Sequence, residues 1–159
     1  MTRNKMAQGT HEATVEWSID GGEFTKGKYT RAHLWRFDGG ARIPASASPQ
    51  VVPVPYSDPG SVDPEEAFVA AIASCHMLWF LSLAQRQGHT VLTYHDEAQG
   101  RLERTEAGTY WVSTVTLRPK TQWSGARPDP DALARLHAGA HAQCYIANSV
   151  KTEIRIQPE

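Results

Sequence analysis

Two absences limit what this sequence encodes: it has few cysteines and no excess of charge of either sign. Its 159 residues contain two cysteines, and 16 Lys and Arg side chains balance 17 Asp and Glu, for a net charge of −1. Because no cluster of basic residues stands out, nucleic acid is not an expected partner. The start of the sequence also lacks the apolar segment of a secretory signal. We therefore expect a cytoplasmic protein whose cysteines are reactive or buried rather than joined in a structural disulfide.

The length and composition are those of a globular protein with a core of its own. A chain of 159 residues falls in the ordinary size range of one domain, and 40% hydrophobic with 21% charged residues argues against disorder or a fibrous repeat. We expect a single domain over residues 13–159. Residues 1–12 are mostly polar, and we expect them to fray.

Turn residues divide the first third of the chain into short strands. Apolar and polar residues alternate over 15–19, and the turn sequence Asp-Gly-Gly follows at 20–22. This pattern predicts a strand that enters a hairpin, with a second strand at about 28–37 and a third beginning at Arg42. The proline-rich segment 44–64 cannot form a regular helix, and we expect this long loop to cover a site or a subunit boundary.

The segment after this loop has the sequence of a long apolar helix. Asp63 is suited to cap the first turn, Pro64 fits the first helical position, and Gly88 supplies a stop, which predicts a helix over about 64–87. Between residues 67 and 84 only two serines and a histidine are polar, so the helix is apolar on every side. We therefore expect it to be buried all round.

A membrane span is the alternative interpretation of this helix, because a largely apolar segment of 18 residues approaches the length that crosses a bilayer. A core helix is favoured, since the segment contains five alanines and the central His76 and no aromatic belt flanks it. One sheet in a small domain cannot cover every face of such a helix. A second copy packed against it can, so we expect a homodimer and no membrane.

The rest of the chain predicts two more strands, a second helix and a closing strand. Alternating residues predict a strand near 90–103 that returns at 109–117, followed by a connecting loop at 119–130. An aspartate followed by a proline opens a helix at about 130–143, and residues 150–156 alternate as an edge strand. This order of elements predicts an α+β fold, with antiparallel sheets around a buried central helix.

The two cysteines are the first candidates for chemistry. Cys75 lies in the middle of the first predicted helix, and Cys144 lies just past the second. Their spacing matches neither the Cys-x-x-Cys of a thioredoxin nor a zinc ribbon. Because free cysteine is often simply buried, spacing alone leaves packing and catalysis open.

Two local sequences are more informative than the spacing. Residues 63–75 read Asp-Pro-Glu-Glu-Ala-Phe-Val-Ala-Ala-Ile-Ala-Ser-Cys, and residues 144–154 read Cys-Tyr-Ile-Ala-Asn-Ser-Val-Lys-Thr-Glu-Ile. Both resemble the cysteine segments of the OsmC/Ohr family, the osmotically inducible and organic hydroperoxide resistance proteins, in the family's order and separation. The resemblance covers nearly all of the chain after residue 12. It implies the family's α+β fold and its intertwined dimer.

The resemblance also implies a thiol peroxidase. As in the family, the Cys75 thiolate would attack an organic hydroperoxide or hydrogen peroxide and become a sulfenic acid, which Cys144 would condense with to form a disulfide. The family's reductant is an external dithiol, typically a lipoyl group or a similar small thiol. No bound cofactor is implied.

A glutamate and an arginine assist the attacking thiol in the family. Glu65 occupies the position of the glutamate. Arg31 is our choice for the arginine because, on the second predicted strand, it shares a face with aromatic residues whereas Arg36 points the other way. Ten residues of helix place Glu65 about 15 Å from Cys75 along the axis. Either the helix is broken between them or Glu65 acts on the cysteine of the partner subunit, and both options predict a site at a dimer interface.

Two alternatives stay open. His137 and His141 lie with Cys144 on one face of the second predicted helix, and with His76 they would supply the ligands of a zinc or iron site. The other alternative keeps the fold without catalysis. In that case the aromatic face of the second strand and the buried cleft would bind a small apolar molecule, and the cysteines would only sense the redox state.

Overall fold

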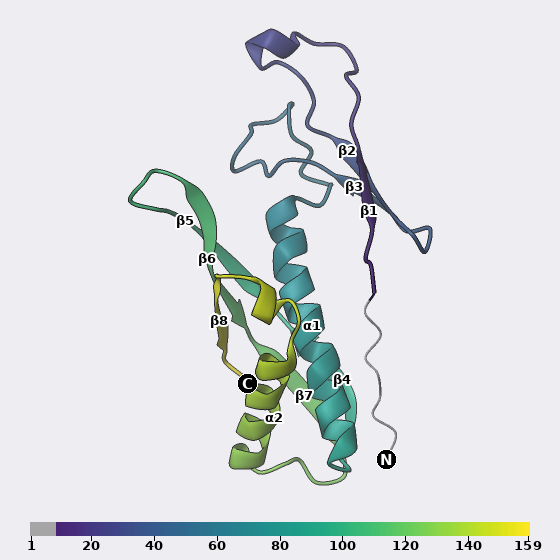
Figure 1. Ribbon diagram of the computed structural model, residues 1–159, viewed down its shortest axis with the longest axis vertical. Helices are drawn as coiled ribbons and strands as arrows, with labels where there is room; N and C mark the ends of the chain where they lie inside the picture. The colour runs from purple at the N-terminus through teal and green to yellow at the C-terminus, as the bar shows by residue number, and fades with distance from the viewer. Residues whose placement is uncertain (1–8) are drawn as a thin grey trace. The chain divides into compact units, whose positions relative to one another are not determined.

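The computed structural model describes residues 9–159 (Figure 1). The chain divides into two compact units, one ending at Pro64 and the other comprising Glu65–Glu159, and each is described by itself. Residues 9–12 have no regular structure, and the rest of the segment predicted to fray lies outside the described residues. The single domain expected over 13–159 stays a prediction.

The first unit contains a three-stranded antiparallel sheet. Its strands are β1 (Ala13–Glu16), β2 (His33–Phe37) and β3 (Arg42–Ala45), in the order β1-β2-β3. The three predicted strands are therefore present, but β1 and β2 are shorter than the alternation of residues indicated. The long connection between them, residues 17–32, is the reason.

This connection is folded by glycines rather than by strand pairing. Gly21 and Gly22 have positive φ angles of 70° and 84°, and a Cβ atom on Gly22 would lie 2.2 Å from the carbonyl oxygen of Lys28. A one-turn 3₁₀ helix, η1 (Phe24–Lys26), follows. The prediction of a strand from residue 28 is thus wrong, and Arg31 lies in the connection before β2 rather than on a strand face.

The proline-rich loop contains no regular helix, as predicted. It folds back on the end of β3: the Ser46 amide donates to the Val62 carbonyl at 3.0 Å, and the Ser46 hydroxyl accepts from the Asp58 amide at 2.9 Å. Ala45 and Ser46 are fully buried. The expected role of this loop as a cover for a site stays a prediction.

The long helix α1 (Pro64–Arg86) begins and ends where the sequence predicted. It starts directly after Asp63. At its other end Gly88 adopts a φ of 80°, the Gly88 amide donates to the Gln85 carbonyl, and the His89 amide donates to the Ala84 carbonyl, both at 3.0 Å. This paired arrangement satisfies carbonyls that the helix leaves open and requires a glycine at the turn.

One stripe of α1 is buried, not every side. The buried residues follow one another at intervals of four: Ile72, His76, Phe80 and Ala84. On the other side Ala71, Ser74 and Leu78 are exposed, and Leu78 exposes 60% of its surface. The single chain therefore does not cover α1 all round, and the expected cover by a second copy stays a prediction. By length and composition α1 would suffice to cross a membrane, but its buried stripe packs as the core of a globular unit.

The second unit places two sheets beside α1. The strands β4 (Thr90–Asp96) and β7 (Pro119–Ser124) pair antiparallel. The strands β5 (Gln99–Arg104), β6 (Tyr110–Leu117) and β8 (Glu153–Ile156) form the other sheet, in the order β5-β6-β8. The edge strand β8 is parallel to β6, and the remaining pairs are antiparallel. This is an α+β fold with two helices and antiparallel sheets, as predicted, apart from the β6–β8 pair.

Two predictions in this region are wrong. The strand expected over 90–103 is two strands, β4 and β5, which separate at residues 97–98 and join different sheets. The loop expected at 119–130 begins with β7. The Asp96 carboxylate accepts from the Arg118 amide at 2.6 Å, which ties the end of β4 to the junction of β6 and β7.

The second helix, α2 (Pro130–Gln143), begins as predicted, with the Asp129 side chain accepting from the Ala132 amide at 2.8 Å. Figure 1 shows α2 beside the second half of α1, where the two helices share a buried apolar cluster. The first half of α1 packs on β6 instead, through Ile72, Val115 and Leu117. A short 3₁₀ helix, η2 (Ala147–Ser149), follows α2. The middle of α1 thus lies where the two clusters meet.

Candidate redox site

Cys75 and Cys144 come together where α2 ends against the middle of α1. Cys75 is half-buried on α1, and Cys144 is the C-terminal cap residue of α2 with 1% of its surface exposed. Both are free thiols, and their side chains form a hydrogen bond with each other. Packing of α2 along α1 therefore places in contact two sulfur atoms that are remote in the sequence.

The surroundings of Cys144 favour its protonated form. The pKa of Cys144 is raised to about 11, chiefly by burial and also by the hydrogen bond with Cys75. The backbone amides of Ala147, whose nitrogen lies 3.4 Å from the sulfur, and Ile146 act in the opposite direction but do not prevail. At neutral pH Cys144 is therefore a protonated thiol.

Asn148 holds the turn that carries Cys144. Its side-chain nitrogen donates to the carbonyl oxygens of both Ala142 and Cys144 at 3.0 Å, and its backbone amide donates to the Cys144 carbonyl at the same distance. These bonds satisfy carbonyls at the end of α2 and fix the backbone from which the Cys144 side chain projects.

An aromatic pair lies beside the two sulfurs. Trp79 follows Cys75 by one helical turn and so shares its face of α1, and Tyr145 directly follows Cys144. The two rings pack edge to face, with centroids 5.6 Å apart and an interplanar angle of 86°. Trp79 is half-buried and Tyr145 is exposed, so the pair forms an apolar surface that solvent reaches.

A second pair of side chains also joins α1 to α2. His76 Nε2 lies 3.1 Å from His137 Nδ1 in a hydrogen bond, with the rings 4° from parallel, and Phe80 stacks on His137 with ring centroids 4.4 Å apart. Burial lowers the pKa of each histidine to about 4, and for His76 the neighbouring His137 and His141 contribute further. Both rings are therefore neutral at physiological pH.

The metal alternative finds no matching geometry in the described part of the chain. Over residues 9–159 no group of three or more His, Cys, Asp or Glu side chains is placed to hold a metal ion. His141 is exposed, whereas His76 and His137 are paired with each other. The spacing of apolar residues along each helix identifies both histidines as buried core residues. His76 lies on the buried stripe of α1, and His137 lies with Leu133, Leu136 and Ala140 on the buried face of α2.

Glu65 is half-buried in the first turn of α1, ten residues before Cys75. No break interrupts α1 between them, so the two residues of one chain lie about 15 Å apart along the axis. Of the two options that the sequence left, a broken helix is wrong.

Arg31 belongs to the first unit, and its contacts are local. Its guanidinium group donates to the carbonyls of Gly27 at 2.9 Å and Tyr29 at 2.6 Å and lies 3.7 Å above the Tyr29 ring. Because Arg31 precedes β2, it does not share a strand face with aromatic residues, and that prediction is wrong. Its role at the cysteines stays a prediction.

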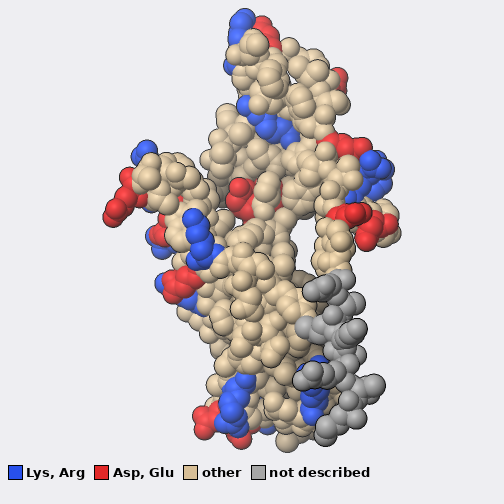
Figure 2. Space-filling view, in the orientation of Figure 1, with Lys and Arg blue, Asp and Glu red and all other residues tan. Residues whose placement is uncertain are grey.

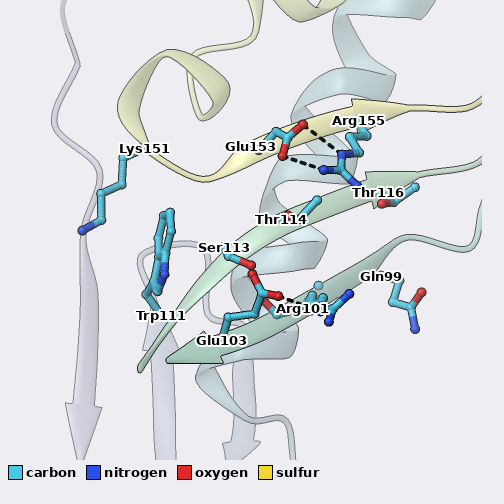
Figure 3. Close-up of a pocket in the computed structure, with 11 residues that line it drawn as sticks. Gln99, Arg101, Glu103, Trp111, Ser113, Thr114, Thr116, Lys151, Glu153 and Arg155 are labelled. Carbon is cyan, nitrogen blue, oxygen red and sulfur yellow. Dashed lines mark hydrogen bonds and ion pairs between the residues drawn. The ribbon is translucent and has the colours of Figure 1, made fainter. Parts of the chain in front are cut away.

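Charged side chains of both signs lie on the surface outside this site. Figure 2 shows Lys and Arg interspersed with Asp and Glu on the visible face. A groove of about 590 Å³ runs over the sheet β5-β6-β8, with Trp111 and Lys151 near one end and Gln99 near the other (Figure 3). Lys151 lies 5.0 Å from the centre of the Trp111 ring. None of the predicted site residues lines this groove.

Comparison with known proteins places the chain among relatives of similar length. A family model described as OsmC-like protein matches residues 57–159. A solved OsmC-like protein of unknown function from Vibrio cholerae is 49% identical, with a TM-score of 0.92 over 96% of this chain and 100% of that one. The organic hydroperoxide resistance protein OhrB of Bacillus subtilis is 18% identical, with a TM-score of 0.68 over 96% of this chain and 100% of its own.

An OsmC-like protein from Mycoplasma pneumoniae is 11% identical, with a TM-score of 0.71 over 96% of this chain and 98% of that one. At this identity, and at that of the Bacillus protein, the likeness shows a common fold. No curated protein matches the chain.

Proposed function

The chain belongs to the OsmC-like family, and from this premise we propose that it is a thiol-dependent peroxidase that reduces organic hydroperoxides with Cys75 and Cys144. The observation that carries the proposal is the hydrogen-bonded pair of free thiols, one half-buried and one buried with a raised pKa. A structurally similar protein, from Bacillus subtilis, is named for organic hydroperoxide resistance.

The reaction begins at the sulfur of Cys75. Its thiolate attacks one oxygen of the hydroperoxide, the O–O bond breaks, and the other oxygen leaves with a proton as an alcohol. Cys75 is then a sulfenic acid. The sulfur of Cys144 attacks the sulfur of Cys75, water leaves, and a disulfide forms. The two electrons gained by the peroxide thus come from the two thiols, and an external dithiol such as a lipoyl group restores them by exchange.

The different surroundings of the thiols support this order of events. Cys75 is half-buried, so a peroxide has access to its sulfur, whereas Cys144 is covered. Burial raises the pKa of Cys144, so Cys144 retains its proton at neutral pH and does not compete with Cys75 for the first attack. A sulfur in this state is suited to react second, once Cys75 has become an electrophile.

The aromatic pair of Trp79 and Tyr145 supports an organic rather than an inorganic peroxide. An alkyl chain attached to the peroxide gains free energy by covering exposed aromatic surface, while hydrogen peroxide has no such group. Truncation of Trp79 is expected to impair turnover of a large alkyl hydroperoxide more than turnover of hydrogen peroxide.

A dimer is part of the proposal. The stripe of Ala71, Ser74 and Leu78 is exposed in the single chain, and a second copy would cover it. Because α1 is unbroken, Glu65 would act on the cysteine of the second copy, together with Arg31. This assignment of Glu65 and Arg31 rests on the family resemblance.

The proposal is tested by following peroxide consumption with dihydrolipoamide as reductant. The wild-type protein is expected to consume cumene hydroperoxide faster than hydrogen peroxide, and Trp79→Ala to lower that ratio while leaving hydrogen peroxide turnover within about twofold, because only the alkyl group contacts the ring. Wild-type protein with free thiols and no turnover of either peroxide would contradict the proposal and leave a non-catalytic ligand-binding protein.

A further inference from the structure

His76 and His137 form a polar contact inside an otherwise apolar interface. They connect α1 and α2 by a hydrogen bond of 3.1 Å, and only 1% and 4% of their surfaces are exposed. His76 directly follows Cys75, and His137 precedes Cys144 by seven residues, which is about two turns of the same helix. The histidine pair and the sulfur pair are therefore two side-chain links between the same two helices.

Stability does not account for this contact. The structure gives His76 Nδ1 no hydrogen-bond partner among the residues it describes, although the atom is buried. Such an atom costs free energy, and replacement of both polar partners by apolar groups of similar shape is often neutral or stabilising. The stacked Phe80 shows that an aromatic ring fits beside His137. A contribution to the free energy of unfolding therefore does not explain why two histidines occupy these positions.

A directional contact sets the register of two helices, which apolar packing sets less strictly. The surrounding cluster consists of Phe80, Ala84, Leu133, Leu136 and Ala140. The small Gly139 allows close approach, since a Cβ atom there would lie 3.0 Å from Leu83. The hydrogen bond, by contrast, requires one separation and one orientation of the two rings.

We propose that His76 and His137 are positioning residues, which hold α2 on α1 in the register that lets the sulfurs of Cys75 and Cys144 bond. The proposal deepens the proposed function, on which it rests for its role in turnover. A disulfide tolerates only a narrow range of backbone separations, and a misplacement of about 1 Å lowers the rate of a positioned reaction by up to about 100-fold.

The consequence for turnover is a competition at Cys75. Its sulfenic acid either condenses with Cys144 and releases water, or reacts with a second hydroperoxide, which transfers one oxygen to the sulfur, leaves as an alcohol and converts Cys75 irreversibly to a sulfinic acid. Loss of the histidine contact slows the first path and leaves the second unchanged. Attack on the first peroxide needs no contact with Cys144 and stays as it was.

The first test measures the disulfide without any peroxide. The Cys75–Cys144 disulfide is equilibrated with dithiothreitol, and the exchange constant reports how well the sulfurs are placed. In His137→Phe, which keeps a ring against Phe80 but removes the hydrogen bond, we expect this constant to fall by about 10- to 100-fold. In His137→Asn, whose amide takes the place of Nδ1, we expect it to be within about threefold of wild type.

A double variant separates positioning from stability. His76→Phe with His137→Phe leaves no unpaired polar atom, so its resistance to urea should return to the wild-type value. If the pair positions the sulfurs, the exchange constant of the double variant stays low. An exchange constant that recovers together with stability, or that is unchanged in His137→Phe, would overturn the proposal.

The second test measures turnover. With excess tert-butyl hydroperoxide, His137→Phe should form the sulfenic acid within about twofold of the wild-type rate but lose at least about five times more Cys75 to sulfinic acid, counted by mass spectrometry. An unchanged sulfinic fraction would contradict the proposal. If wild-type protein fails to react with peroxide at all, the proposed function fails, while the exchange constants still decide the role of the histidines.

Discussion

Cys75 and Cys144 contact each other but differ in nearly every other respect. Cys75 lies in the middle of a helix, half-buried, beside an aromatic ring one turn away. Cys144 ends a helix and is buried, and backbone amides of the next turn point at its sulfur. Its pKa is raised to about 11, chiefly by burial.

In the reaction that we propose, this difference lets one contact support two roles. The less buried sulfur reacts with the peroxide first, and the covered sulfur keeps its proton until then. The raised pKa of Cys144 makes it a poor nucleophile toward the peroxide. Its fixed backbone holds its sulfur next to Cys75, where it can attack the sulfenic acid.

Replacing Cys75 should have the largest effect. In Cys75→Ser the hydroxyl is a far weaker nucleophile than a thiolate, so peroxide turnover should fall by at least about 1,000-fold. The measurement is consumption of tert-butyl hydroperoxide with dihydrolipoamide. Residual turnover above a few per cent would mean that Cys144, or no cysteine, is the site of attack.

Replacing Cys144 should remove only the second half of the reaction. Cys144→Ser is expected to consume the first equivalent of peroxide at a rate within about threefold of wild type but not to turn over, because Cys75 has no thiol with which to condense and further peroxide only converts its sulfenic acid to sulfinic acid. Rapid mixing with one and with ten equivalents of peroxide separates the two phases. If Cys144→Ser failed to consume even the first equivalent of peroxide, Cys144 would be needed for the first attack, and the proposed roles of the two cysteines would be wrong.

A charge on the exposed stripe of α1 should dissociate the proposed dimer. Leu78→Arg places a cation where Leu78 exposes 60% of its surface, and we expect the dimer dissociation constant to rise by at least about 100-fold. Sedimentation at several concentrations is the measurement. Leu92→Arg, on an exposed position of β4, is the matched control and should leave the dimer intact. A wild-type chain that is monomeric at every concentration would contradict the dimer.

The histidine pair should make stability fall in acid. The pKa of His76 and that of His137 are lowered from 6.5 to about 4, so below pH 6.5 the unfolded chain binds more protons than the folded one. Stability present above pH 6.5 is therefore lost as the pH falls toward 4, by about 3 kcal/mol for one histidine. Urea unfolding at several pH values measures this loss. The double phenylalanine variant should lose less, and an equal loss would assign the effect to other groups.

Loosening the turn of Cys144 should have the smallest effect. Asn148→Ala removes side-chain bonds to the carbonyls of Ala142 and Cys144, which should cost about 1 kcal/mol of unfolding free energy and shift the exchange constant with dithiothreitol by about threefold. Ser149→Ala, which removes a bond to the Tyr145 carbonyl, is the control. It should lower stability without moving the exchange constant. Equal shifts of the exchange constant in both variants would show that Asn148 does not specifically position Cys144.

The helices could be predicted because their ends are encoded locally. Asp129 before Pro130, Pro64 in a first turn and Gly88 after a last one each act within a few residues, and the structure places both helix starts and the stop of α1 there. Strand pairing is not local. Nothing within 90–103 indicates that the chain changes sheets at residues 97–98, because the partner strands β7 and β6 lie 20 or more residues away or across a turn.

The connection before β2 shows another limit of periodicity. Residues 28–32 alternate like a strand, yet the backbone follows the turn imposed by Gly21 and Gly22. The alternation predicts that Arg31 lies on a strand face, and no strand forms at that residue. Alternation of side chains along a segment does not show whether a neighbouring strand is available to pair with it.

Only part of the candidate site can be predicted from the sequence. Cys75 and Cys144 were identified by family resemblance, but neither spacing nor periodicity predicts that their sulfurs meet. His76 and His137 were considered as metal ligands, although each lies at an apolar position of its helix. That both positions face each other depends on how α2 docks on α1, which is a tertiary property.

The most direct measurement is a count of thiols before and after one equivalent of tert-butyl hydroperoxide per chain, followed by mass spectrometry of the peptides. Our account predicts that two thiols disappear together and that the peptides of Cys75 and Cys144 are recovered joined by a disulfide. Two thiols that survive the peroxide, or a single loss at Cys75 with Cys144 still free, would contradict it.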